Sequence, residues 1–175
     1  MEIVFSQDYG RSFTAYSKKS AINIKDSFNQ RNVATLTIDS CNLVNSKPDW
    51  QNRSNKISIQ LTQIELINMA NYILGYSESC SGNYHGTEKN KSFQVHDNGL
   101  SGIIINSHQA GRTISGVIPT EGRQLLITMV FGRLAFGWGV SVADAIGLLK
   151  IDFARKRAIA ATKAEGYSHP QQGHH

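Results

Sequence analysis

Apolar and polar residues alternate along four stretches in the first third of the chain, which is the pattern of β-strands with one buried face. In the longest stretch, Ala34, Leu36 and Ile38 fall on one face, and Thr35 and Thr37 fall on the other. The four predicted strands are FTAY (13–16), SAINIKD (20–26), VATLTIDSCNLV (33–44) and KISIQL (56–61). The residues before them are interpreted as a polar lead, and NSKPDWQNRSN (45–55) as a polar loop.

The period of the pattern then changes from two to about 3.6 in TQIELINMANYILG (62–75), which predicts a helix. Thr62 and Glu65 have the spacing of a capping box at its start, and Gly75 is a typical residue at its end. The apolar stripe expected to pack on the core is Ile64, Ile67, Ala70, Ile73 and Leu74.

The same order of elements follows a second time. Four further strands are predicted in CSGNYH (80–85), KSFQVHD (91–97), LSGIIINSH (100–108) and RTISGVI (112–118). Pro119 and Thr120 mark the start of a second helix, which runs through LLITMVFGRLAF and ends at Gly137-Trp138-Gly139. Its expected core stripe is Leu126, Val130, Phe131 and Leu134. Four strands and a helix, repeated, predict a fold of the α+β class.

A third helix is predicted beyond this repeat, in residues 141–166. Ser141 is its expected N-cap, and its apolar stripe is Val142, Ala145, Ile146, Leu149 and Phe153. The last residues, YSHPQQGHH (167–175), are expected to be disordered. We therefore predict a domain in residues 1–139, followed by a C-terminal helix and tail in residues 140–175.

Composition limits the classes of function. The chain has 175 residues, 40% of them hydrophobic, and a formal net charge of +5, which is basic but mild. Residues 1–140 hold 13 Lys and Arg against 10 Asp and Glu. Charge alone is therefore too weak to hold a nucleic acid, so stacking and hydrogen bonds from Asn, Gln and Ser have to contribute.

Two cysteines, Cys41 and Cys80, are too few for a disulfide framework, and free thiols are expected. The N-terminus lacks the pattern of a secretory signal, and no apolar run has the length of a membrane span. The expected location is the cytoplasm, with no membrane contact.

Several short motifs stand in a recognisable order. The residues concerned are Ser17–Asn23 (SKKSAIN) after Tyr16, Pro48-Asp49-Trp50 before a basic strand, Glu78-Ser79-Cys80 before Tyr84 and His85, and Ile118-Pro119 before a helix that ends at Gly137-Trp138. In this order and spacing the chain resembles the Whirly-type single-stranded nucleic-acid-binding proteins. The resemblance covers residues 13–138, and residues 140–175 have no counterpart in that family.

The resemblance implies two antiparallel four-stranded sheets, each followed by a helix, with four copies assembled through helices 62–75 and 120–137. It also implies that single strands, DNA or alternatively RNA, lie across the sheets with little sequence preference. The expected role is to protect or organise exposed DNA strands in replication, recombination, repair or transfer, without a cofactor and without catalysis.

Candidate nucleic-acid contacts divide by chemistry into cations for phosphates, aromatic rings for stacking, and polar groups for bases or sugars. They are Lys18, Lys19, Arg53, Lys56, Lys89 and Lys91; Tyr16, Trp50 and Tyr84; and Asn23, Ser58 and Gln60. Each group also has an interpretation without a ligand. The lysine pair would then be a solvated turn, and the polar positions would be an ordinary solvent-exposed sheet face. Trp50 would anchor its own loop, which is the interpretation we favour for Trp50.

Other functions have weaker support in the sequence. An enzyme or metal site would have to draw on Cys80, His85, His96 and His108, whose spacing matches no common zinc site. We therefore expect neither catalysis nor a metal. A second alternative is an oligomeric scaffolding module that contacts a protein through the polar sheet face.

Overall fold

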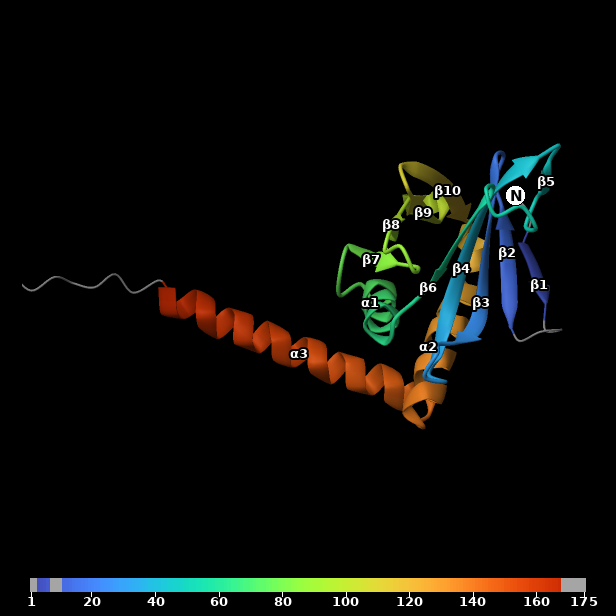
Figure 1. Ribbon diagram of the computed structural model, residues 1–175. Coiled ribbons are helices and arrows are strands. Elements are labelled where there is room, and N and C mark those ends of the chain that lie inside the picture. Colours follow the sequence, from blue (N-terminus) through green and yellow to red (C-terminus); the bar gives the residue numbers. More distant parts are fainter. Residues whose placement is uncertain (1–2, 7–10, 168–175) are drawn as a thin grey trace, which may run out of the picture.

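The computed structural model describes residues 3–6 and 11–167, which form two antiparallel β-sheets and three α-helices (Figure 1). The first sheet contains β1 (Ile3–Ser6), β2 (Ser12–Tyr16), β3 (Ser20–Phe28), β4 (Ala34–Val44), β5 (Lys47–Pro48) and β6 (Lys56–Gln60). The second contains β7 (Ser79–His85), β8 (Lys91–Asp97), β9 (Ile103–Gln109) and β10 (Arg112–Ile118). The α+β class and the order of four main strands and then a helix, twice, are confirmed.

Two short strands were not predicted. β1 pairs with β2 where a polar lead was expected, and β5 pairs with the end of β4 inside the predicted loop. Both are short additions to the first sheet, because β2, β3, β4 and β6 correspond to the four stretches of alternating residues.

The first sheet buries one face, as its alternation predicts. Directly opposite residues of neighbouring antiparallel strands share a face, and Phe13, Ile24, Ile38 and Ile59 stand in one such row. All four are buried, as are Ile57 and Leu61. The odd-numbered residues of β3 and β4 therefore lie on the opposite, outer face.

The second sheet has the order β10-β9-β8-β7 and packs its apolar side on the same core. Two contacts set the two sheets against each other. The Ser40 and Ser107 hydroxyls hydrogen-bond at 2.6 Å in the interior, and Gly116 lies so close to Ile22 that a Cβ there would be 2.2 Å from the Ile22 Cγ1. This close packing fixes which residues of the second sheet reach the first.

Helix α1 (Gln63–Ile73) begins with the predicted capping box. The Thr62 side chain accepts a hydrogen bond from the Glu65 N–H, and the Glu65 carboxylate accepts one from the Thr62 N–H. The predicted core stripe is confirmed in part, because Ala70 is buried and Ile67, Ile73 and Leu74 are partly buried against the core. Ile64 is 71% exposed, and the buried residues are Glu65, Leu66, Met69, Ala70 and Tyr72. The helix is rotated about its axis relative to the prediction, because Glu65 faces inward and contacts His85.

A short 3₁₀ turn (Thr120–Gly122) leads into α2 (Arg123–Trp138), which lies against β4 and ends at Gly139 in the left-handed conformation. Its predicted stripe of Leu126, Val130, Phe131 and Leu134 is buried. Arg133 is also only 6% exposed, and its guanidinium donates to the Thr35 carbonyl at 3.2 Å. These contacts join α2 to the inner face of the first sheet.

Helix α3 (Val142–Tyr167) begins at Ser141, whose hydroxyl accepts from the Asp144 N–H at 3.1 Å. Only its first half packs on the body, through the buried Ala145 and Leu149, and the rest extends away from it (Figure 1). The predicted disorder concerns residues 167–175, of which 168–175 lie outside the described residues.

Candidate nucleic-acid interface

The outer face of the first sheet is polar along its middle. Asn23 stands opposite Asp39 on β4, and Asp39 stands opposite Ser58 on β6. One step along, Lys25 belongs to the same face, in a row that ends at Gln60. The predicted contacts Asn23, Ser58 and Gln60 therefore share one surface.

Asp39 lies at the centre of this surface and is 5% exposed. The Lys25 Nζ donates to its Oδ2 at 2.7 Å, and the Ser58 hydroxyl donates to its Oδ1. The carboxylate is thus paired and hydrogen-bonded, as a buried charge has to be. The Lys25 side chain remains 44% exposed, so its ammonium group is accessible from solvent.

Three adjoining hollows, the largest about 640 Å³, lie over this face. Each pair of hollows has one lining residue in common, which is Lys25, Lys56 or Ser58. We call them the polar groove. Of the predicted contacts, the groove collects Asn23, Trp50, Arg53, Lys56, Ser58, Gln60 and Lys91. The charged residues that line it are Lys25, Arg53, Lys56 and Lys91, with Asp39 as the acidic one. The arrangement presents cations, hydroxyls and amides side by side.

One end of the outer face is covered by the segment that precedes β6. Ala21 and Cys41 belong to this face but are fully buried, and Asp49 lies beside the Cys41 thiol. Burial raises the pKa of Cys41, with a smaller contribution from the Asp49 carboxylate, so the thiol stays neutral. Trp50 is half-buried and lines the groove, so it forms part of the groove wall.

Two serines hold the turn between β2 and β3 against β10. The Ser17 hydroxyl accepts from the Val117 N–H at 3.2 Å, and the Ser20 hydroxyl donates to the Ser115 carbonyl at 2.5 Å. Lys18 and Lys19 between them are exposed and take part in no ion pair within the described part of the chain. The serines therefore hold the turn and leave both ammonium groups to solvent.

Tyr16 is half-buried on the outer face at its covered end, opposite Ala21. It lies next to the lysine turn but does not line the groove. The structure thus places Tyr16, Lys18 and Lys19 together at one end of the sheet.

Tyr84 and Lys89 are not brought to the groove. The pairing of β7 with β8 shifts between Gly82 and His85, and Tyr84 there has a φ of 63° and is 78% exposed. Lys89 lies in the following turn with a φ of 51°. Neither residue lines any of the three hollows that form the groove.

Two basic residues of the second sheet reach the first. The Lys91 Nζ donates to the Ser58 carbonyl at 3.2 Å, and the Arg112 guanidinium donates to the Lys56 carbonyl at 3.1 Å. Lys91 was among the predicted contacts, whereas Arg112 was not. The groove therefore has walls from both sheets.

His85 lines the groove and was considered in the sequence only as a metal ligand or catalytic group. Its Nε2 lies 2.8 Å from the Glu65 Oε1, and the Thr62 N–H donates to the other oxygen at 2.8 Å. Burial opposes the ionisation of Glu65, but the hydrogen bonds from His85 and Thr62 outweigh it and lower the pKa. This pair explains why Glu65 faces inward.

Lys25 is a second residue that was missed, although its signal was present in the sequence. The alternation of SAINIKD places Lys25 on the same face as Asn23. The prediction followed basic residues near turns and passed over this one inside a strand.

The remaining candidates for chemistry are dispersed. Burial, with a smaller contribution from Glu65, raises the pKa of the Cys80 thiol to about 12, so it is not activated as a nucleophile. Within residues 3–6 and 11–167, no three His, Cys, Asp or Glu side chains gather where they could hold a metal ion.

No single helix in the described ranges is long and apolar enough to cross a membrane. Residues 120–138 and 142–163, which meet at 90°, reach that length and apolar character only when taken together as a bent pair. Comparison of the chain with models of known protein families, with curated proteins and with solved structures found no match.

Proposed function

We propose that this chain is a non-catalytic single-stranded nucleic-acid-binding protein of the Whirly type, with DNA as its main ligand. The observation that carries the proposal is the polar groove, which gathers seven of the twelve predicted contacts on one face of the first sheet. The lysine turn lies at the end of the same sheet and extends its basic surface.

The chemistry of the groove suits unpaired nucleotides. Its four cations exceed its one carboxylate, so phosphates are attracted and counterions are released on binding. Trp50 offers a ring for stacking, which is tolerant of sequence because every base has a π-face. A sheet face with no projecting helix is a poor fit to the major groove of a duplex.

Exposed apolar residues on two helices support assembly into a tetramer. Ile64 on α1 is 71% exposed, and Ile127 and Phe136 on α2 are 40% and 65% exposed. Such residues cluster at interfaces between subunits. Helices 62–75 and 120–137 are therefore the proposed contact between copies.

A titration followed by fluorescence anisotropy tests the ligand. Labelled oligo-dT, a DNA duplex and an RNA of equal length are each titrated with protein at two salt concentrations. We expect oligo-dT to bind most tightly, with a salt slope of about −0.7 for each phosphate contacted. Equal or tighter binding of the duplex would contradict the proposal, and tighter binding of the RNA would make RNA the ligand.

A matched pair of variants tests the groove itself. Lys56→Ala removes a cation that lines two of the three hollows, and should weaken oligo-dT binding and lower the salt slope by about 0.7. Lys150→Ala makes the same change on α3, at an exposed position outside the groove, and should leave binding unchanged. A chain that binds no oligonucleotide at low salt would favour the scaffolding alternative.

A further inference from the structure

Within the described residues, the distal half of α3 has no tertiary support from the rest of the chain. Phe153 stacks on Tyr76, with ring centroids 3.9 Å apart, and is the last residue of the helix to pack on the body. Beyond it, every described side chain, residues 154–163, is exposed. An isolated helical segment of this length is marginal in water, so a partner would stabilise it.

An apolar stripe follows the helix on the side away from the body. Ala145 and Leu149 face the body and are buried, whereas Leu148, Ile151 and Ile159 are 51%, 67% and 48% exposed. Arg155 and Ala158 stand between Ile151 and Ile159, and with these two positions the stripe has the three- and four-residue spacing of a helix that packs on another helix.

We propose that this face of α3 pairs antiparallel with α3 of a second copy of the chain. The register that places Leu148 opposite Ile159 of the second copy also places Asp152 opposite Arg155, and Asp144 opposite Lys163. A two-fold axis repeats each pair, so two Asp152–Arg155 ion pairs lie between the two Leu148–Ile159 contacts, and two Asp144–Lys163 ion pairs lie beyond them. Parallel pairing would instead set Arg155 against its own copy.

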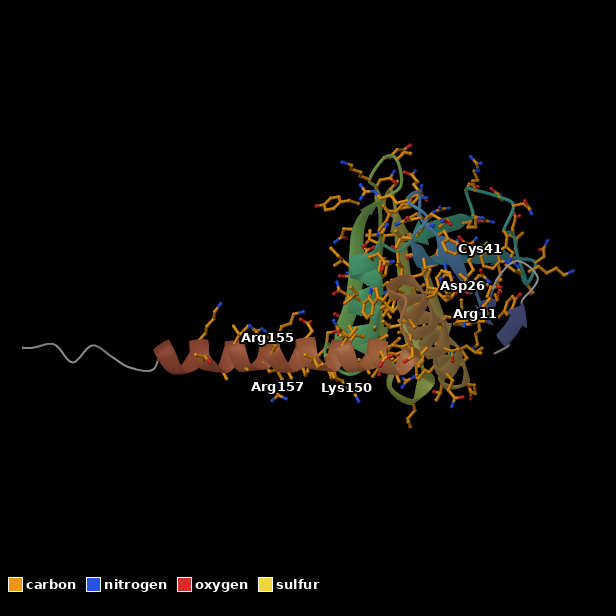
Figure 2. The ribbon with its side chains drawn as sticks, turned by 90° about the horizontal axis from the view of Figure 1, so that it is seen from below. Arg11, Asp26, Cys41, Lys150, Arg155 and Arg157 are labelled. Atoms are coloured by element: carbon orange, nitrogen blue, oxygen red, sulfur yellow. The ribbon has the colours of Figure 1, made fainter. Side chains whose placement is uncertain are left out.

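The orientation of the charged side chains agrees with this register. Arg155 lies on the opposite side of α3 from Lys150 and Arg157, so the basic residues divide between two sides of the helix (Figure 2). Asp152 already pairs with Lys156 of its own helix, with 2.6 Å between the Lys156 Nζ and the Asp152 Oδ2. This bridge is exposed and therefore weak, and it leaves Asp152 able to take a second cation. The contact is distinct from the proposed one through α1 and α2, and it does not depend on nucleic acid.

Disulfide trapping in the full chain tests the register. Leu148→Cys and Ile159→Cys are made singly and together, and the protein is oxidised without nucleic acid. The native Cys41 and Cys80 are buried and do not interfere. We expect the double variant to give a covalent dimer, and each single variant to remain uncrosslinked. In the proposed register, two copies of position 148 are about 16 Å apart, beyond the reach of a disulfide.

Three outcomes are informative. A crosslink in the double variant alone supports the antiparallel pair. Crosslinking of L148C alone would show a parallel pair and overturn the register, and no crosslink in any variant would overturn the pairing. Loss of nucleic-acid binding has no bearing on these results, so failure of the proposed function is distinguishable from failure of this inference.

Charge reversal gives a second readout by sedimentation equilibrium. Arg155→Glu should weaken self-association about tenfold, because it sets two carboxylates against each other, and Asp152→Arg with Arg155→Glu should restore it. Arg157→Glu is the matched control, since it makes the same change on the other side of the helix, and should leave the association constant unchanged. Equal weakening by R155E and R157E would contradict the proposed face.

Discussion

Asp39 places a negative charge in the middle of a surface that we propose binds phosphates. It fixes Lys25 and Ser58 through hydrogen bonds to its two oxygens. Its cost is that it cancels one of the four cations of the polar groove. Asp39 therefore lowers the affinity of the groove for phosphates but holds Lys25 and Ser58 in place. A substitution of Asp39 should change the affinity and the stability in opposite directions.

We predict that Asp39→Asn binds oligo-dT several-fold more tightly at low salt, because Lys25 loses its counterion and adds to the charge of the groove. It should also lose about 1–3 kcal/mol of stability, because buried hydrogen bonds to a charge are broken. Anisotropy titration and urea denaturation measure the two quantities. Asp26→Asn is the control, since Asp26 pairs with Arg11 at 3.1 Å outside the groove, and it should lose stability without a change in affinity.

Glu65 predicts a pH dependence of stability. Its pKa in the folded chain is lowered from the ordinary value of 4.5, so it binds its proton more weakly folded than unfolded. Its stabilisation is therefore complete above pH 4.5 and is lost as the pH falls through the lowered pKa. Glu65→Gln should be less stable than the wild type at pH 7, and the difference should shrink below about pH 4.5. Urea midpoints between about pH 3 and pH 7 measure it, and a constant difference would contradict the assignment.

At the scale of elements, different residues of the turn between β2 and β3 attach it to the fold and carry its charge. Ser17 and Ser20 bind β10, and Lys18 and Lys19 form no ion pair within the described ranges. A change in the lysines should therefore affect only a ligand, whereas a change in the serines should affect the fold.

We predict that Lys18→Ala with Lys19→Ala weakens oligo-dT binding and lowers the salt slope by about 0.7 for each phosphate that is no longer bound, with no change in the urea midpoint. Ser17→Ala with Ser20→Ala should lower the midpoint, by about 1 kcal/mol of stability for each hydrogen bond. If the lysine variant binds as the wild type does, the turn is only a solvated connection.

The strands were predicted more reliably than the helix faces, for a physical reason. A strand with alternating residues has only two possible faces, and in β4 just one of the two is mainly apolar. In α1 two stripes compete, one through Ile64 and Ile67 and one through Leu66 and Met69, and both have helical spacing. The choice between them depends on the contact of Glu65 with His85, a residue far along the chain.

The groove was predictable only in part. Asn23, Ser58 and Gln60 follow from strand alternation and register, and Lys25 was available by the same reasoning. The arrival of Lys91 at Ser58 depends on how the two sheets pack, which is set by contacts such as Gly116 on Ile22. No local pattern encodes such a contact between distant segments.

At the scale of the whole molecule, the exposed apolar residues of α1 and α2 predict an oligomer. We expect light scattering to give about four times the chain mass of 19.3 kDa. Ile64→Glu should reduce the mass, because it places a charge in a dry contact between copies. Gln94→Glu, on the exposed outer side of β8, should leave the mass unchanged. A wild-type protein that is monomeric, or an I64E variant with the wild-type mass, would contradict the assembly.

The docking of Ser17 and Ser20 on β10 has a consequence for behaviour at high concentration. β10 is the last strand of its sheet, and an end strand with free N–H and C=O groups can recruit a strand from another molecule and begin aggregation. The two hydroxyls occupy the Val117 N–H and the Ser115 carbonyl, so that border offers an incoming strand fewer sites to extend the ladder. Strand addition at the β10 border is therefore less favourable when many copies crowd together.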